Sequence, residues 1–247
     1  FVLRQGRRLM ARPMKGTSPR GRSTEEDDSL AANLADSTKD RAENVMIVDL
    51  MRNDLGRVAE AGSVEPLDMY RVERYPTMLQ MTSTVRAVAR EGVSLRELFK
   101  AVFPCGSVTG APKVRAMQLI RDVEQGPRNV YCGAVGFLEP GGDCVFNVPI
   151  RTLWLDREAG RAMFHSGGGI THDSGAVAEY AECMTKMAFL KPALQHGSFR
   201  LLETMLLRRG SISLLEYHLD RMRDSARYFG FLFDEDAIRA ALGRAAQ

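Results

Sequence analysis

Residues 39–56, KDRAENVMIVDLMRNDLG, carry the clearest structural pattern in the sequence. Apolar side chains recur there at intervals of three and four residues, which is typical of a helix. The pattern already begins near Ser29, and Gly56 is placed to act as the C-cap. The sequence therefore predicts a long helical region from Ser29 to about Gly56.

Strand-like segments lie on both sides of this helix. Residues 1–13 mix apolar and polar side chains in the manner of a strand. Residues 14–28 (MKGTSPRGRSTEEDD) are predicted to form a loop because glycine and proline punctuate them. Residues 62–75 and 81–89 are rich in Val, Tyr and Thr and are predicted to be extended. A short amphipathic helix is expected over residues 94–102.

The second half of the chain alternates glycine-rich turns with helices and strands. A glycine loop leads to Pro112, which is expected in the first turn of a helix. The runs YCGAVGFLE (131–139) and CVFNVPIRTLWL (144–155) are predicted to form a hairpin through the turn PGGD. Residues 161–166 are a further expected strand, and Ser174 is placed to cap a helix over residues 175–194.

The pattern starts again near His196, with a strand, a turn, a strand and a helix. We therefore expect a domain boundary there. One domain would cover residues 1–195, and residues 196–247 would be the start of a second.

Composition excludes several classes of protein. Of 247 residues, 45% are hydrophobic and 26% are charged, which is ordinary for a protein with a core. No apolar run is long enough to span a membrane, and the first residues do not form a signal peptide. The net charge of +3 gives no reason to expect a nucleic-acid partner, and the four cysteines form no metal-ligand pattern. We expect a cytoplasmic protein with reduced thiols and no membrane partner.

Two predicted helices each carry two acidic residues three positions apart. Asp40 precedes Glu43, and Glu179 precedes Glu182, so each pair shares one helix face. Two such faces together would provide the oxygen ligands that Mg²⁺ prefers. The alternative is that all four carboxylates are solvated helix surface.

Two glycine segments precede predicted helices. They are Gly106–Gly110 and Gly167–Gly169, and neither matches a P-loop or a dinucleotide-binding pattern. Unobstructed backbone N–H groups at such places can bind a carboxylate or a phosphate. The alternative is two tight turns that require glycine.

Two basic residues have unusual surroundings. Lys15 lies between a proline-containing segment and a glycine, where burial would make its amine a nucleophile; an ordinary surface lysine is the alternative. Arg151 ends an apolar run that is predicted to be a buried strand, so it needs a partner. That partner is either a substrate carboxylate or an internal Asp or Glu. Together the residues indicate an α/β or α+β enzyme with a Mg²⁺ site and a carboxylate site.

Seven segments of the sequence, taken in their order along the chain, resemble the chorismate-utilising enzymes, the family of anthranilate, aminodeoxychorismate and isochorismate synthases. The resemblance covers about residues 1–190, and its segments are RPMKGTSPRG, KDRAENVMIVDLMRNDLGRV, FPCGSVTGAPKVRAMQLI, YCGAVGF, IRTL, SGGGIT and EYAECMTKMAFL. The fold that it implies is the C-terminal part of an α+β sandwich of antiparallel sheets flanked by helices. Within the family, a lysine in PMKGT marks component I of aminodeoxychorismate synthase, whereas anthranilate synthases have alanine.

The resemblance implies a role for each matching residue. Lys15 would attack C2 of chorismate while the C4 hydroxyl leaves, and ammonia from a glutamine amidotransferase would then add at C4 and displace the lysine. Glu43 and Glu182 would bind Mg²⁺, with Asp40 and Glu179 beside them. The chorismate contacts that it implies are Thr17, Ser107, Tyr131, Arg151, Gly168, Gly169 and Lys186.

Two departures from the family pattern accompany this resemblance. Gln80 stands where anthranilate synthases usually have an active-site histidine, and an amide cannot act as a general acid. This agrees with a different route through Lys15, or with a weakened enzyme. Family members also have a long region before PMKGT, including a glutamate thought to be a general acid, so we expect this chain to be an excerpt that is inactive alone.

The last fifty residues resemble the opening of a class IV pyridoxal-phosphate (PLP) enzyme, the aminodeoxychorismate lyases. Arg221 matches a phosphate-contacting arginine, and the resemblance places the PLP lysine beyond Gln247. A plain α+β cap without cofactor is the alternative. The whole then predicts a bifunctional enzyme of folate biosynthesis, in which PLP binds only to the complete lyase domain. The rival functions are anthranilate synthase component I and a non-catalytic family member.

Overall fold

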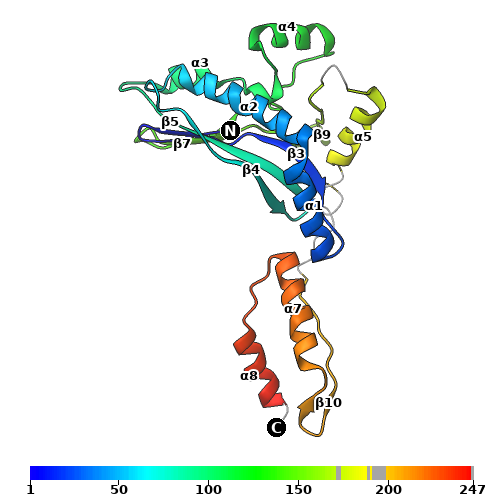
Figure 1. The fold of residues 1–247 in the computed structure, drawn as a ribbon. Coiled ribbons are helices and arrows are strands. Elements are labelled where there is room, and N and C mark those ends of the chain that lie inside the picture. Colours follow the sequence, from blue (N-terminus) through cyan, green and yellow to red (C-terminus); the bar gives the residue numbers. More distant parts are fainter. Residues whose placement is uncertain (171–173, 188–189, 191–198, 246–247) are drawn as a thin grey trace.

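The computed structural model describes residues 1–170, 174–187, 190 and 199–245 (Figure 1). Its first elements are two strands, β1 (Val2–Gln5) and β2 (Arg8–Ala11), which pair as an antiparallel hairpin. The turn between them contains Gly6 with φ +56°, a conformation that favours glycine. The strand expected over residues 1–13 is therefore two strands.

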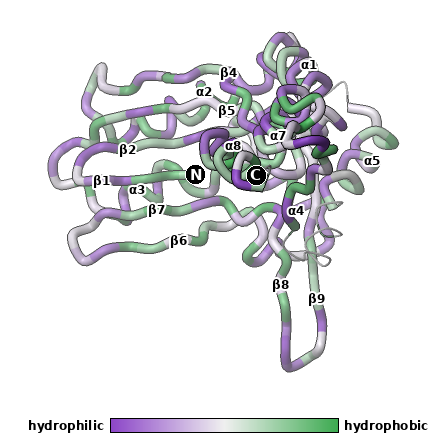
Figure 2. The backbone as a smooth tube through the Cα atoms, turned by 90° about the horizontal axis from the view of Figure 1, so that it is seen from below, coloured by the Kyte–Doolittle hydropathy of each residue, from purple (hydrophilic) through white to green (hydrophobic). Residues whose placement is uncertain are grey.

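One antiparallel sheet organises the described part of the chain. Its remaining strands are β3 (Met14–Pro19), β4 (Glu65–Tyr75), β5 (Met78–Val88), β6 (Val135–Leu138) and β7 (Cys144–Asn147). Strand β5 is central, because β4 pairs with one of its edges and both β2 and β3 pair with the other. Strands β1, β7 and β6 continue the sheet outward, and Figure 2 shows this order.

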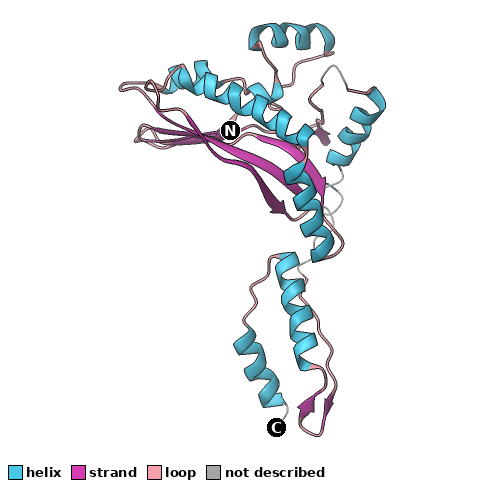
Figure 3. Cartoon of the chain, in the orientation of Figure 1, coloured by secondary structure: helices cyan, strands magenta, loops and turns pink. Residues whose placement is uncertain are grey.

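Helices α1 (Thr24–Asp36), α2 (Thr38–Gly56) and α3 (Leu95–Val102) cover this sheet. Figure 3 shows α2 and α3 along one face of the strands. Buried apolar side chains join the two layers: Ile47, Val48, Met51 and Leu55 from α2, Val85 and Ala87 from β5, and Leu98 from α3. Burial of apolar area of this kind is the main stabilising contribution to the fold.

Three sequence predictions for residues 14–56 are wrong. Residues 14–28 are not a loop, because β3 occupies Met14–Pro19 and α1 begins at Thr24 with Ser23 as its cap. The long helix is interrupted at Ser37, whose hydroxyl accepts a hydrogen bond from the Asp40 amide and starts α2. Gly56 is the last residue of α2 rather than its C-cap.

The second half of the domain has smaller elements. They are the 3₁₀ turn η1 (Gly106–Val108), α4 (Lys113–Val123), the hairpin β8 (Leu153–Asp156) and β9 (Arg161–Phe164), and α5 (Ala176–Met187). Pro112 is the N-cap of α4, and β6 and β7 form the predicted hairpin. The run 144–155 is not one strand, because residues 148–152 leave the sheet before β8 begins. Figure 2 shows β8 and β9 projecting beside the main sheet.

The C-terminal segment, residues 199–245, has the predicted order of strand, turn, strand and helix. Strands β10 (Leu207–Arg208) and β11 (Ser211–Ile212) lead to α7 (Leu215–Phe229) and α8 (Glu235–Ala245). In Figure 1 the end of α7 lies next to α1. The expected boundary between residues 195 and 196 lies outside the described residues, as do residues 188–189 and 191–194 of the predicted 175–194 helix.

The α+β fold class with antiparallel sheets and flanking helices is confirmed. In the described residues, no helix combines the length and hydropathy that a membrane crossing requires.

Candidate active site around Lys15

Lys15 lies on an irregularity in β3. The pairing of β3 with β5 shifts register between Met14 and Thr17, so Lys15 and Gly16 form a bulge. Gly16 has φ +90°, and a Cβ atom there would lie 3.0 Å from the Cβ of Asp40. Glycine is therefore required both by the backbone conformation and by the close approach of α2. The bulge directs the lysine toward α2, where its Nζ lies 3.9 Å from Oε2 of Glu43.

A buried amide in α2 supports this bulge. Asn44 is fully buried, and its Nδ2 donates to the carbonyl oxygen of Lys15 at 3.5 Å. Its Oδ1 accepts a hydrogen bond from the Ser83 hydroxyl at 2.6 Å, and that hydroxyl in turn accepts from the Tyr70 amide. Asn44 and Ser83 were not among the predicted site residues. The sequence could not predict that Asn44 is buried, because its burial depends on the packing of β5 against α2.

Gln80 and Thr17 form a second support. Gln80 is 6% exposed, and its Nε2 donates to the carbonyl oxygen of Gly16 at 2.7 Å. Its Oε1 accepts from the Thr17 hydroxyl at 3.1 Å. The two residues face each other in the β3–β5 register. The Gln80 amide therefore holds the lysine bulge, which gives this residue a structural role beside its position in the site.

The second glycine segment lies against these residues. A Cβ atom on Gly169 would be 2.6 Å from Nζ of Lys15, and one on Gly168 would be 2.6 Å from Oε2 of Glu179. A Cβ on Gly167 would be 3.0 Å from the Tyr131 hydroxyl. The side-chain ends of Lys15, Glu179 and Tyr131 therefore converge on the backbone of residues 167–169, and a side chain there would displace them.

Helix α5 supplies the opposite wall. Lys186 Nζ donates to the Gly167 carbonyl oxygen at 2.9 Å and lies 2.7 Å from Oε1 of Glu182. The hydrogen bond from Lys186 lowers the pKa of Glu182, and the charges of Lys186, Lys15 and Lys39 act in the same direction. Glu182 therefore lies near enough to Lys15 for the two charges to interact.

Arg151 is placed differently from the sequence prediction. It lies in the segment between β7 and β8 rather than inside a strand, with φ +52° and a half-buried side chain. Burial lowers the pKa of its guanidinium, and the charge of Glu182 opposes that change. Its Nη1 contacts the sulfur of Met78 at the start of β5. The charge of Glu182 thus favours the charged guanidinium, and the partner of Arg151, a substrate carboxylate or an internal acid, stays a prediction.

The four acidic residues meet the requirements of Mg²⁺ in part. Glu179 receives a hydrogen bond from Ser174 on Oε1 at 2.8 Å, whereas its buried Oε2 has no hydrogen-bond partner among the described residues. Asp40 accepts from the Ser37 hydroxyl. In the described residues, no three Asp, Glu, His or Cys side chains are grouped so that they could hold a metal ion. Since Mg²⁺ keeps several waters and often takes one or two carboxylates, the oxygen donors present suit it.

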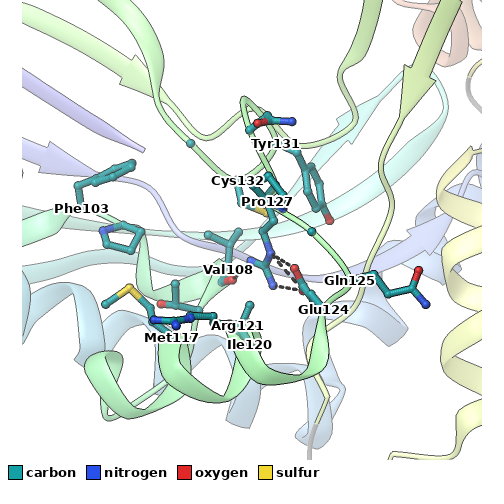
Figure 4. A pocket seen from close by; sticks show the side chains of 16 residues that line it. Phe103, Val108, Met117, Ile120, Arg121, Glu124, Gln125, Pro127, Tyr131 and Cys132 are labelled. Atoms are coloured by element: carbon teal, nitrogen blue, oxygen red, sulfur yellow. Dashed lines mark hydrogen bonds and ion pairs between the residues drawn. The ribbon is translucent and has the colours of Figure 1, made fainter.

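Tyr131 lies between this site and a neighbouring cavity. Its ring stacks on His165 with centroids 5.3 Å apart, and burial raises the pKa of its phenol to about 12. The cavity, of 620 Å³, opens between η1, α4 and the segment that carries Tyr131 (Figure 4). Glu124, which is paired with Arg128, lies at its rim, and Figure 4 shows apolar side chains such as Ile120 and Met117 on the α4 side.

Ser107 lies in η1, where its hydroxyl is 3.1 Å from the Cys105 sulfur. A buried ion pair holds the helix after this turn: Lys113 Nζ lies 2.8 Å from Oδ2 of Asp54, which is 3% exposed. Burial raises the pKa of Asp54 even though Lys113 opposes the change. Neither Asp54 nor Lys113 was predicted as part of a site, and their pairing fixes the start of α4 on the end of α2.

Arg221 does not present a free cation. Its guanidinium donates to both carboxylate oxygens of Glu203, which lies 2.6 Å from Nδ1 of His218. The Glu203 side chain is 7% exposed. A carboxylate in this position already neutralises the arginine, so the residues present do not by themselves fit the phosphate of PLP.

Comparison with known proteins gives two family matches. Residues 1–192 match the chorismate binding enzyme family, and residues 200–247 match the class IV aminotransferases. Aminodeoxychorismate synthase component 1 of Escherichia coli (strain K12) is 46% identical over 187 residues, 76% of this chain and 41% of the relative. Anthranilate synthase component 1 of Methanothermobacter marburgensis is 41% identical over 191 residues, 77% of this chain and 41% of the relative.

Solved structures agree with this relationship. Anthranilate synthase component I from Streptococcus pneumoniae TIGR4 is 36% identical, with a TM-score of 0.67, over 75% of this chain and 40% of that one. A putative 2,3-dihydroxybenzoate-specific isochorismate synthase from Bacillus anthracis has a TM-score of 0.70 at 24% identity. The match covers 79% of this chain and 52% of that one, and it supports the fold alone. The chain spans about two fifths of the length of the curated relatives above. Over residues 1–192 it belongs to the family of chorismate binding enzymes.

Proposed function

We propose that this chain is part of component I of an aminodeoxychorismate synthase, with Lys15 as its nucleophile. One observation carries the proposal: a lysine on a glycine-supported bulge, whose amine lies between Glu43 and the backbone of Gly169. An amine can form a bond to an allylic carbon and later leave from it, and alanine can do neither. Relatives named aminodeoxychorismate synthase component 1, at 40–46% identity, support the same assignment.

The chemical steps balance as two displacements. In the first, unprotonated Nζ of Lys15 forms a bond to C2 of chorismate, both conjugated ring double bonds shift (C1=C2 to C1=C6, C5=C6 to C4=C5), and the C4–O bond breaks. The hydroxyl leaves as water with the proton that the attacking amine gives up. In the second, ammonia forms a bond at C4, both double bonds shift back, and the C2–Nζ bond breaks, while the proton that ammonia gives up returns to Nζ. The product is 4-amino-4-deoxychorismate, an intermediate of folate biosynthesis in the cytoplasm, and the ammonia would come from a glutamine amidotransferase.

The chain's own residues would hold the substrate for these steps. Arg151, Lys186 and the Tyr131 hydroxyl supply positive charge and donors for carboxylates, together with the backbone of residues 168–169. Thr17 and Ser107 complete the proposed contacts. Gln80 and Asn44 fix the bulge, so that Nζ approaches the ring from one direction.

Mg²⁺ would be held by Glu43 and Glu182, with Asp40 and Glu179 beside them, and would supply positive charge for a substrate carboxylate. The lysines would leave Glu43 and Glu182 when the ion binds, because each carboxylate is now paired with one. PLP enters the proposal only for a complete lyase domain, where Arg221 would have to leave Glu203 in order to contact the phosphate.

The second candidate function is anthranilate synthase component I. It is favoured by relatives of that name at 41–43% identity and by the solved Streptococcus structure. The two functions differ in their product from the same substrates. Aminodeoxychorismate is expected when the full-length gene product is incubated with chorismate, ammonia and Mg²⁺ and the mixture is separated by chromatography. Fluorescent anthranilate, formed without a lyase, would refute the proposal in favour of the second candidate.

A further inference from the structure

The C-terminal segment contacts the sheet domain at the turn that follows the lysine strand. This turn, residues 20–23, connects β3 with α1. The last turn of α7 lies against it: the Tyr228 hydroxyl donates to the Gly21 carbonyl oxygen at 2.6 Å, and Arg227 Nη2 lies 2.8 Å from Oδ2 of Asp28. Figure 1 shows the end of α7 beside α1.

Arg20 is the centre of this contact. Its Nε donates to Oδ1 of Asp27 at 2.6 Å, its Nη1 to the Tyr75 carbonyl oxygen at 2.8 Å, and its Nη2 to the Tyr228 carbonyl oxygen at 3.3 Å. The guanidinium carbon also lies 4.8 Å from the centroid of the Tyr228 ring. One arginine therefore joins α1, the end of β4 and α7. The fixed fork of the guanidinium suits it to this use.

The acidic residues that receive these arginines are held in place from the sheet side. Asp27 is 2% exposed and accepts hydrogen bonds from Arg20, from the Gly21 amide and from Arg74 of β4. Arg74 also lies 2.7 Å from Asp28. Strand β4 thus fixes the acidic side chains that α7 contacts. Such a network contributes more to stability than isolated ion pairs on the surface, which contribute little.

From this geometry we infer that residues 20–28 form a docking surface for the chain's own C-terminal segment, and that α7 braces the turn after the lysine strand. The two family segments are then one unit rather than two independent ones. The surface commits to a helix whose last turn carries Arg–Tyr, because the carboxylate of Asp28, the Gly21 carbonyl and the Arg20 guanidinium each contact a complementary group there. This inference does not depend on the proposed reaction.

Hydrogen exchange of the full chain, followed by mass spectrometry, tests the docking from both sides. Tyr228→Phe deletes the hydrogen bond to Gly21, and Arg227→Gln deletes the ion pair to Asp28. Each is expected to speed exchange in residues 20–28 about fivefold, the effect of one hydrogen bond of typical net strength. The matched controls are Tyr217→Phe, an exposed tyrosine of the same helix, and Arg223→Gln, whose partners Asp220 and Glu235 lie within the C-terminal segment. Both controls are expected to leave the rate of hydrogen exchange in residues 20–28 unchanged.

A variant on the other side of the contact is needed because a substitution in α7 could unfold that helix by itself. Asp28→Asn lies in α1 and is expected to speed exchange in residues 215–229, whereas Glu25→Gln, an exposed acid of the same helix, leaves them unchanged. The inference is overturned if Asp28→Asn changes only α1, or if the α7 variants change only the C-terminal segment.

Discussion

Asn44 gives the sharpest test of how the lysine bulge is held. Asn44→Ala removes a fully buried amide, and the Ser83 hydroxyl then loses the acceptor that lies 2.6 Å away. An unsatisfied buried group costs about 1–3 kcal/mol, and the space left by the side chain adds to that loss. We expect the free energy of unfolding of the sheet domain to fall by about 2–4 kcal/mol.

The assay is urea denaturation of the full-length protein, followed by circular dichroism. Asn33→Ala, an exposed asparagine of α1, is the matched control and is expected to change stability by no more than about 0.5 kcal/mol. Ser83→Ala completes a double-mutant cycle, and the double variant is expected to lose less than the sum of the single variants because they share one hydrogen bond. A loss below about 1 kcal/mol for Asn44→Ala, or strict additivity with Ser83→Ala, would refute the reasoning.

Three further predictions follow from the same geometry. Gly169→Ala places a Cβ 2.6 Å from Nζ of Lys15, so we expect the lysine to be displaced and kcat to fall at least tenfold with little change in the thermal midpoint of unfolding. The control Gly136→Ala, whose Cβ would lie 1.9 Å from a backbone oxygen of Val145, is expected to lower the thermal midpoint instead. A larger loss of thermal midpoint in Gly169→Ala than in Gly136→Ala would contradict this prediction. Since burial raises the pKa of Tyr131 to about 12, its neutral phenol contributes stability that is present below pH 10 and is lost as the pH rises toward 12. At about pH 10.5, above the usual phenol pKa of 10.0 and below the raised value of about 12, the phenolate absorbance of wild type and of Tyr131→Phe should therefore be nearly equal, and a difference of more than half the full value for one tyrosine would count against the burial. For Asp27, burial opposes ionisation, but hydrogen bonds from Arg20, Gly21 and Arg74 lower its pKa below the usual 3.8. Its contribution to folding stability is complete above pH 3.8 and is lost as the pH falls through the lowered pKa. Asp27→Asn should therefore flatten the acid side of a plot of unfolding midpoint against pH, and an unchanged acid side would argue against the hydrogen-bond network.

The sequence predicted the strands and helices that carry a strong periodic or turn signal. The segments around β4, β5, α3 and the β6–β7 hairpin are examples, because their patterns depend on neighbours a few residues away. The strand β3 was missed because it contains a glycine and ends in a proline, which together resemble a loop. Gly16 is in fact the residue that permits the bulge.

The candidate site was predicted from family motifs, and several of its residues do lie together. Lys15, Glu43, Gly169 and Glu182 come from four separate segments that converge on the bulge. Their supports could not be predicted, because the roles of Asn44, Gln80 and Ser83 depend on β5 being placed beside β3 and α2. Arg151 was predicted to lie in a strand because the apolar run hides the end of β7.

The central claim is that Lys15 becomes covalently bonded to chorismate. Its most direct test is peptide mass spectrometry of the full-length enzyme after incubation with chorismate and Mg²⁺ in the absence of ammonia. We expect the peptide that contains Lys15 to gain the mass of chorismate less one water, and Lys15→Ala to remain unmodified and inactive. An unmodified Lys15 in an enzyme that forms aminodeoxychorismate when ammonia is added, or undiminished turnover by Lys15→Ala, would contradict the claim.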